Sequence, residues 1–158
     1  MGGQRVADTL AKLAARGADT WVATASAAGI EHLVPLSYGW DGSNVILAAQ
    51  PASPTVRNIL ASGRARLGFG PTRDVVIVDA TLEASLDAAG APADLAEAYA
   101  RQAGWDPRDE REAYTFLLLR PRRVQAWREA NELAGRTLMR DGTWLFEPEQ
   151  PRDATGRR

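Results

Sequence analysis

The chain has no cysteine, and His32 is its only histidine. These shortages exclude disulfides, thiolate zinc sites, cysteine nucleophiles and metal sites built from several histidines. The 19 Lys and Arg residues nearly balance the 20 Asp and Glu residues, so bulk charge does not favour nucleic-acid binding. No apolar run approaches the ~20 residues that a membrane-spanning helix needs, and the first residues lack the apolar core of a signal peptide. We therefore expect a soluble, cytoplasmic protein without a metal site.

The 158 residues are enough for one domain with its own core. We expect this domain to cover residues 1–146, and the polar, proline-containing residues 147–158 to form a disordered tail. Lys12 is the only lysine, so Arg carries nearly all of the positive charge. Together with abundant Ala, this usage suggests a GC-rich genome.

Hydrophobic patterning predicts a mainly β fold. The Asp41-Gly42 pair is a strong hairpin signal, and Asp141-Gly142 marks a second such turn near the end of the chain. Pro121 indicates an edge or a bend within a long late strand. These features favour a six-stranded antiparallel β-barrel closed on itself. The six main segments are residues 20–26, 30–40, 43–49, 65–70, 73–85 and 114–127.

Three helices are predicted beside these strands. Residues 4–17 and 92–105 both carry apolar residues at the three-and-four spacing of an amphipathic helix. Between them, Ser53 is the expected N-cap of a short helix, Pro54 its first residue and Gly63 its end. The side chains expected to be buried on this short helix are those of Val56, Ile59 and Leu60.

Several strands are apolar at successive positions, notably residues 44–49, 75–80 and 115–119. A strand with one buried face needs apolar residues only at alternate positions, so these strands need cover on both faces. The predicted helices are too few to cover all of them. We therefore expect a homodimer that buries a strand face. A monomer whose own helices lie over the sheet is the alternative.

The start of the short helix is rich in hydrogen-bonding groups, with hydroxyls at Ser53 and Thr55, a guanidinium at Arg57 and an amide at Asn58. A helix N-terminus presents unpaired N–H groups and favours anions, phosphate above all. The fork of Arg57 suits phosphate oxygens. In the alternative interpretation, Ser53 only caps the helix and Arg57 faces solvent.

The order of these elements resembles the flavin/deazaflavin oxidoreductase superfamily, the split β-barrel group that includes pyridoxamine 5'-phosphate oxidase. The resemblance covers roughly residues 5–145. It rests on the proline-containing strand "HLVPLSY", the Asp-Gly turn that follows it, and the segment "SPTVRNI" at residues 53–59. The family has Ser-x-Lys-x-Arg-Asn-Leu in this last place, so Thr55 stands where lysine is frequent. A neutral hydroxyl holds phosphate less strongly than a charged group does.

The resemblance implies a cofactor pocket with three parts. The cofactor phosphate would lie among Ser53, Thr55, Arg57 and Asn58, and the ring beside Val34, Pro35, Leu36 and Ser37. Ala49 and Gln50 would border the ribityl chain. In such dimers the second subunit completes the pocket, and Trp127 and Arg123 are the candidates for this role.

The resemblance also implies an oxidoreductase that transfers a hydride between a deazaflavin, coenzyme F420, and a small conjugated substrate. The cofactor carries the difficult chemistry, so no protein nucleophile is needed. The deazaflavin-using branch is widespread in GC-rich genomes. An FMN-dependent enzyme like pyridoxamine-phosphate oxidase and a non-catalytic flavin-, deazaflavin- or haem-binding protein are the alternatives. Candidates for a basic rim around the acidic deazaflavin tail are Arg57, Arg64, Arg66 and Arg73, and His32 is either an acid or a structural residue.

Overall fold

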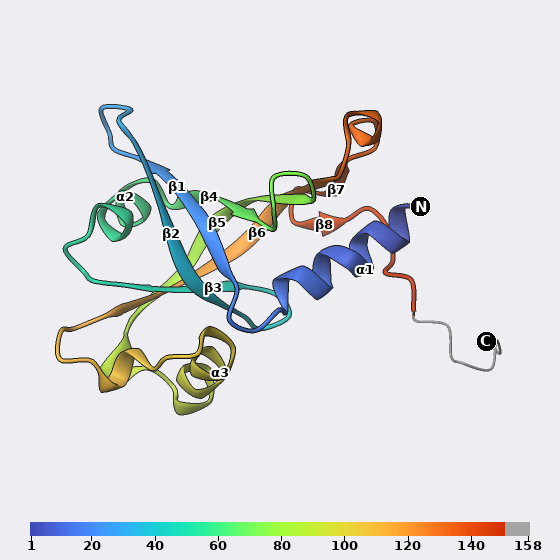
Figure 1. Ribbon diagram of the computed structural model, residues 1–158. Helices are drawn as coiled ribbons and strands as arrows, with labels where there is room; N and C mark the ends of the chain where they lie inside the picture. The colour runs from blue at the N-terminus through green and yellow to red at the C-terminus, as the bar shows by residue number, and fades with distance from the viewer. Residues whose placement is uncertain (151–158) are drawn as a thin grey trace.

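Six antiparallel strands close into a barrel in the computed structural model, which describes residues 1–150 apart from the side chain of Asn131 (Figure 1). The strands lie in the order β3-β2-β1-β4-β5-β6, and β6 pairs back with β3 to close the barrel. The predicted six-stranded antiparallel barrel is therefore confirmed. The barrel strands are β1 (Asp19–Ala25), β2 (Glu31–Trp40), β3 (Val45–Ala49), β4 (Arg64–Phe69), β5 (Val75–Asp87) and β6 (Thr115–Trp127).

A hairpin of β7 (Thr137–Arg140) and β8 (Thr143–Trp144) extends the sheet beyond β6, and it turns at Asp141-Gly142 as predicted. Three helices and three single 3-10 turns complete the described fold. They are α1 (Gly2–Leu13), α2 (Pro54–Ser62), α3 (Ala93–Ala103), η1 (Ala88–Gly90), η2 (Pro107–Asp109) and η3 (Ala130–Glu132).

Helix α2 begins and ends as the sequence predicts. The Ser53 hydroxyl accepts a hydrogen bond from the N–H of Val56 at 3.3 Å, and Pro54 is the first helical residue. Gly63 ends the helix in the left-handed conformation, with φ 73°, which a residue without Cβ adopts at no steric cost. The prediction that Leu60 is buried is wrong, because its side chain is 52% exposed while Val56 and Ile59 face the core.

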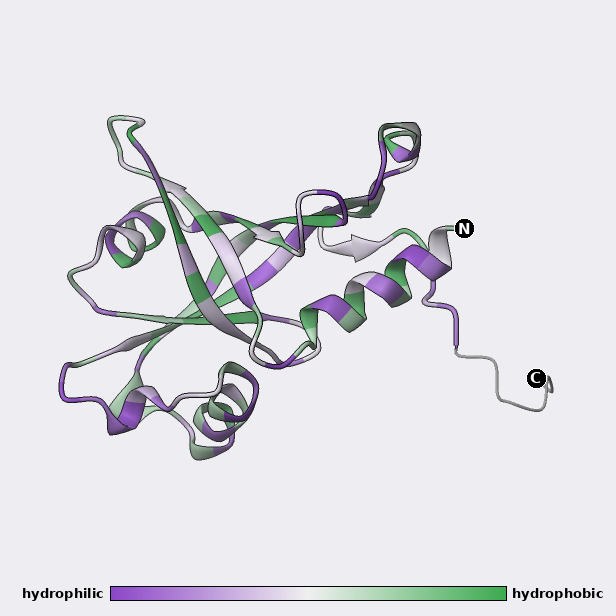
Figure 2. Ribbon diagram, viewed as in Figure 1, coloured by the Kyte–Doolittle hydropathy of each residue, from purple (hydrophilic) through white to green (hydrophobic). Residues whose placement is uncertain are grey.

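Hydrophobic side chains from alternate strand positions fill the barrel. In Figure 2 the barrel strands carry many residues in the green of high hydropathy. Helix α1 adds Val6 and Leu13 to the same core. The phenol of Tyr38 on β2 donates to the carbonyl of Lys12 at 2.9 Å, which ties the end of α1 to the barrel. The fully buried barrel residues include Val22, Leu47, Leu67, Val78 and Leu119.

A second, smaller core lies outside the barrel, where α3 covers β3 and β6. Ile46 and Phe116 point away from the barrel interior and pack against Ala96 and Tyr99 of α3. Strand β3 is consequently buried at all five positions. Helix α3 of the same chain therefore covers β3 and β6, two of the three strands whose apolar runs predict cover on both faces.

The outer face of the β1–β2 hairpin has no such cover within the described chain. Trp21 is 53% exposed and Leu33 is 61% exposed, although both are large apolar residues. Trp21 pairs across the two strands with Pro35, and Leu33 pairs with Ala23, so these four side chains share one face of the sheet. We call Trp21, Leu33 and Pro35 the hairpin patch.

Part of the predicted tail is described. The N–H of Glu149 donates to the carbonyl of Gly3 at 3.1 Å, which places the chain against the start of α1. Residues 151–158 lie outside the described residues, so their disorder stays a prediction. Across residues 1–150, the helices are all too short or too polar to span a membrane.

Candidate functional site

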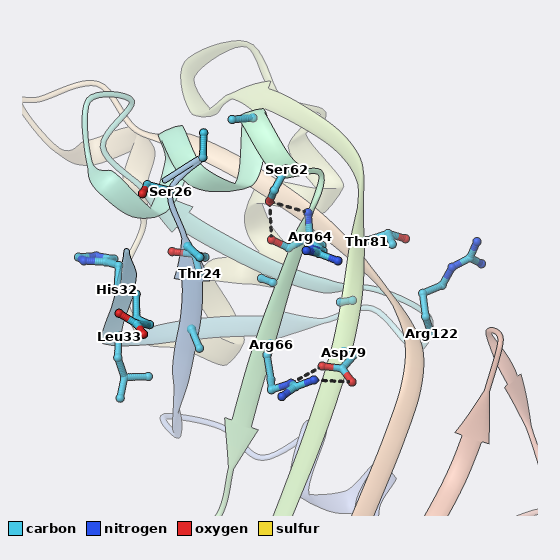
Figure 3. A pocket seen from close by; sticks show the side chains of 17 residues that line it. Thr24, Ser26, His32, Leu33, Ser62, Arg64, Arg66, Asp79, Thr81 and Arg122 are labelled. Carbon is cyan, nitrogen blue, oxygen red and sulfur yellow. Dashed lines mark hydrogen bonds and ion pairs between the residues drawn. The ribbon is translucent and has the colours of Figure 1, made fainter. Parts of the chain in front are cut away.

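A cleft of about 1010 Å³ opens where β1 and β4 separate (Figure 3). The two strands pair at only three positions, ending at Ala23 and Arg66, although β1 continues to Ala25 and β4 begins at Arg64. The unpaired ends of both strands therefore line an opening. The last turn of α2 contributes to the same opening through Ala61 and Ser62.

Small and hydroxyl-bearing side chains form much of the cleft. Thr24 lies at its base, and the Thr24 hydroxyl accepts a hydrogen bond from the Asn58 amide at 3.1 Å. Asn58 thereby ties α2 to β1 just beyond the last β1–β4 pair. The other hydroxyls in the cleft are those of Ser26, Ser62 and Thr81, and the alanines include Ala23, Ala25, Ala65 and Ala80.

Three guanidiniums and two carboxylates line the cleft. Arg66 donates to both carboxylate oxygens of Asp79, at 2.5 and 3.4 Å, and this hydrogen bonding raises the pKa of Arg66. Within residues 1–150, no carboxylate lies within 4.0 Å of the guanidinium of Arg64 or Arg122. Glu31 belongs to β2, on the opposite wall of the cleft.

Arg122 reaches the cleft because of a β-bulge. Asp79 pairs with Arg123, whereas the next residue, Ala80, pairs with Pro121, so Arg122 has no partner in β5. Such a bulge re-aims a side chain relative to a regular strand. The carbonyl of Arg122 accepts from the N–H of Gly142 at 2.8 Å, which fixes the bulge to the β7–β8 turn. The bend predicted at Pro121 is thus present.

None of the eleven predicted cofactor-binding residues lines the cleft. Ser53 caps α2, and Thr55 is only 2% exposed. Asn58 reaches the cleft indirectly, through its bond to Thr24. Arg57 is exposed and lies four residues before Ala61, so the two residues share one face of α2.

The four residues predicted to lie beside the ring follow Leu33 along β2. Val34 and Leu36 pack against the barrel core, whereas Pro35 is exposed on the outer face. The Ser37 hydroxyl accepts from the indole N–H of Trp105 at 2.6 Å and is hydrogen-bonded to the Tyr99 phenol at 3.2 Å. Any contact of Ser37 with a ring would therefore involve its backbone.

Ala49 and Gln50 lie at the end of β3. Ala49 is buried in the barrel core, and Gln50 follows it as an exposed residue. Two of the predicted rim residues, Arg64 and Arg66, do line the cleft. Arg73 does not, because it lies beside Glu129, with 3.9 Å between their charged groups.

Trp127 lines a different cavity of about 300 Å³, between α1 and the end of β6. The guanidinium of Arg136 lies 5.3 Å from the centre of its ring, a cation–π contact. Asp74 in this cavity accepts from Lys12 at 2.5 Å and from Arg128 at 3.3 Å. The bond from Lys12 is the main reason why the pKa of Asp74 is lowered. These charges hold α1 to the barrel.

Sequence patterning missed seven polar residues of the cleft: Thr24, Ser26, Glu31, Ser62, Asp79, Thr81 and Arg122. For Arg122, the sequence carried a signal in the segment Pro121-Arg122-Arg123. Two consecutive exposed charged residues inside an otherwise alternating strand are typical of a bulge.

The closed barrel has the split β-barrel fold, and comparison with solved structures confirms the fold that the resemblance implied. An F420 reductase superimposes with a TM-score of 0.59 at 16% identity, covering 71% of this chain and 92% of that one. A putative pyridoxamine 5'-phosphate oxidase from Listeria innocua gives 0.58 at 8% identity, covering 77% and 97%. A heme binding protein from Mycobacterium smegmatis gives 0.60 at 18% identity, covering 87% of this chain and 56% of that one.

At these identities the comparisons establish a common fold alone. No protein-family model matches the chain, and no curated protein matches its sequence.

Proposed function

We propose that this protein is an oxidoreductase that holds a flavin-type cofactor in the cleft between β1, β2, β4 and the end of α2. The observation that carries the proposal is the cleft itself. Its volume of about 1010 Å³ is sufficient for a cofactor-sized molecule, and it lies on a fold shared with an F420 reductase.

The residues present fit such a group. Alanines leave room for a flat ring, and the hydroxyls of Ser26 and Thr81 suit a polyhydroxylated chain. Arg57 lies about one helical turn from the cleft residue Ala61, within reach of a phosphate at the rim. A bound flavin or deazaflavin supplies the hydride donor or acceptor. The chain itself binds and orients the cofactor and shields it from water.

Of the two cofactors, we favour the deazaflavin, with FMN as the alternative. Arg64 and Arg122 line the cleft, and neither has a carboxylate within 4.0 Å among residues 1–150, whereas Arg66 is paired with Asp79. With Arg57 proposed for the phosphate, these two guanidiniums are available to the acidic tail that distinguishes the deazaflavin from FMN. The proposed substrate is a small conjugated molecule that stacks on the cofactor ring.

We also propose that the protein acts as a homodimer. The support is the hairpin patch, in which Trp21 and Leu33 expose more than half of their surface. Leu33 also lines the cleft, so a second copy docked on the patch would add a wall to the cofactor site. The contribution of Trp127 from the second subunit stays a prediction.

Haem is a second candidate ligand, because the only imidazole of the chain, that of His32, lines the cleft. An imidazole nitrogen ligates haem iron, and guanidiniums pair with its propionates. This interpretation predicts haem absorbance that shifts when His32→Ala removes the ligand. The same substitution is expected to leave flavin binding unchanged.

The test is a titration of the purified protein with coenzyme F420, FMN and haemin, followed by absorbance and fluorescence. We expect the deazaflavin to bind and Arg57→Gln to weaken it roughly tenfold, because a charged hydrogen bond is lost. Arg101→Gln, an exposed arginine on α3, is the control and should bind as the wild type does. If neither F420 nor FMN binds, the proposed function is wrong.

A further inference from the structure

We propose that Arg123 and Arg136 form a small-anion site on the outer face of β6, which binds a phosphate or carboxylate group. The site lies outside the cleft, since neither residue lines it. It therefore goes beyond the proposed function and can be tested without a cofactor. Gln125 and Trp127 hold the two guanidiniums in place.

The alternation of side chains along β6 brings three of these residues to one face. Val124 and Ala126 are buried in the barrel core. Successive side chains of a strand point to opposite faces, so Arg123, Gln125 and Trp127 point to the outside of the barrel.

Arg136 reaches the same face from the turn that leads into β7. The carbonyl of Arg136 accepts from the N–H of Ala126 at 2.9 Å, which fixes its backbone against β6. Its guanidinium lies 5.3 Å from the centre of the Trp127 ring. A cation–π contact restricts the position of the planar fork. The fork is therefore ordered before any ligand arrives.

Both guanidiniums converge on one atom, the amide oxygen of Gln125. This oxygen accepts from Nε of Arg136 at 3.1 Å and from Nη2 of Arg123 at 3.2 Å. The amide turns its oxygen to this side because its own N–H groups could not face two donors. Since both donor nitrogens lie so close to the same atom, one anion beside the amide can accept from both guanidiniums.

The positive charge of this pair is not neutralised among residues 1–150, where no carboxylate lies within 4.0 Å of either guanidinium. Asp79 lies opposite Arg123 in the β5–β6 register, but its carboxylate is bonded to Arg66. A guanidinium has five N–H donors, so one bond to a neutral amide leaves donors for a further acceptor. Two like charges that share a neutral oxygen repel each other, and a bound anion offsets this repulsion.

The test is a calorimetric titration of pyrophosphate at low ionic strength, where screening is weak. We expect the double variant Arg123→Gln, Arg136→Gln to bind pyrophosphate at least ~10-fold more weakly than the wild type, because charged hydrogen bonds are lost. The matched control is the double variant Arg120→Gln, Arg140→Gln. It removes the same charge from exposed residues of β6 and β7 and should bind as the wild type does.

A second readout locates the bound anion. The ring of Trp127 contacts Arg136, so its indole N–H resonance should shift when pyrophosphate is added. The indole of Trp105, which donates to Ser37, should not respond. Trp127→Phe assigns the resonance. Circular dichroism checks the fold of each variant, and Arg123→Gln alone, at an exposed position, should still weaken binding at least ~3-fold if the double variant does not fold.

Three results would overturn the proposal. They are no pyrophosphate binding by the wild type, equal weakening in the two double variants, and a Trp127 resonance that does not move. Equal weakening would assign the binding to a general basic surface.

Titration with F420 identifies the source of the anion. If F420 binding weakens in the Arg123, Arg136 double variant as pyrophosphate binding does, the anionic group belongs to the cofactor. If F420 binding is unchanged, the group belongs to another small molecule. Pyrophosphate binding that depends on these two residues, without any flavin binding, upholds the site and contradicts the proposed function. Flavin binding that depends on Arg57, together with equal pyrophosphate binding in the two double variants, does the reverse.

Discussion

Tyr99→Ala is expected to lower the free energy of unfolding by roughly 3–5 kcal/mol, the usual range for removing a large aromatic side chain from a core. Tyr99 is fully buried, and its ring meets those of Phe116 and Trp105 edge to face, with centroids 5.2 and 6.0 Å apart. Truncation would leave a cavity between α3 and β2. For a chain of this size, the melting temperature should fall by roughly 10–15 °C.

Tyr99→Phe separates the ring from the hydroxyl. Burial raises the pKa of Tyr99 to about 12, so the phenol stays protonated at neutral pH and is hydrogen-bonded to Ser37. Removing the Tyr99 hydroxyl should lower the free energy of unfolding by only about 1 kcal/mol, since Ser37 keeps its hydrogen bond from Trp105. Chemical denaturation measures the free energy of unfolding of both variants. A loss below 1 kcal/mol in Tyr99→Ala would mean that α3 does not pack on β3 and β6 as described.

The double variant Trp21→Asp, Leu33→Asp is expected to convert a homodimer into a monomer. A hot-spot residue at the centre of an interface contributes about 2 kcal/mol or more, a buried carboxylate adds a desolvation cost, and every substitution occurs twice around a two-fold axis. The dimer dissociation constant should therefore rise by far more than ~100-fold. Sedimentation velocity measures this change directly.

Leu145→Asp is the matched control for the dimer, because Leu145 is an exposed leucine beside β8, away from the β1–β2 hairpin (Figure 1). It should sediment as the wild type does. Cofactor affinity should fall with the dimer, because Leu33 lines the cleft as well as the patch. A wild-type protein that sediments as a monomer at all accessible concentrations contradicts the homodimer.

Local patterning was enough to predict the elements of this fold. Ser53, Pro54 and Gly63 defined α2 to the residue because caps and helix ends depend on neighbours in sequence. The buried face of α2 was less well defined. Leu60 is apolar, yet it points to solvent, because the direction in which a short helix docks is decided by the barrel beneath it.

Cover of the strand faces depended on tertiary packing. The apolar runs in β3 and β6 correctly indicated burial on both faces, but the cover there is α3. The hairpin patch carried a similar signal that the sequence-based prediction did not use. Trp21-Val22-Ala23 and the run at residues 33–36 are apolar at successive positions, so both faces of the β1–β2 hairpin are apolar.

The cleft could not be predicted, because it depends on non-local register. Whether β1 and β4 pair over three positions or five is decided by the packing of two strands almost 40 residues apart in the sequence. Of the residues that the sequence suggested for the site, Arg64 lines the cleft, and Asn58 bonds to the cleft residue Thr24. Arg57 lies one helical turn before the cleft residue Ala61. It could not tell which end of α2 the opening adjoins.

The most direct measurement of the central claim is the deazaflavin affinity of a protein whose cleft is filled. Ala61 and Leu60 are adjacent exposed residues of α2, but only Ala61 lines the cleft. Ala61→Trp places an indole in the proposed cofactor space and should abolish detectable F420 binding, whereas Leu60→Trp should bind as the wild type does. Equal F420 affinity in the two variants would contradict a cofactor site in the cleft between β1 and β4.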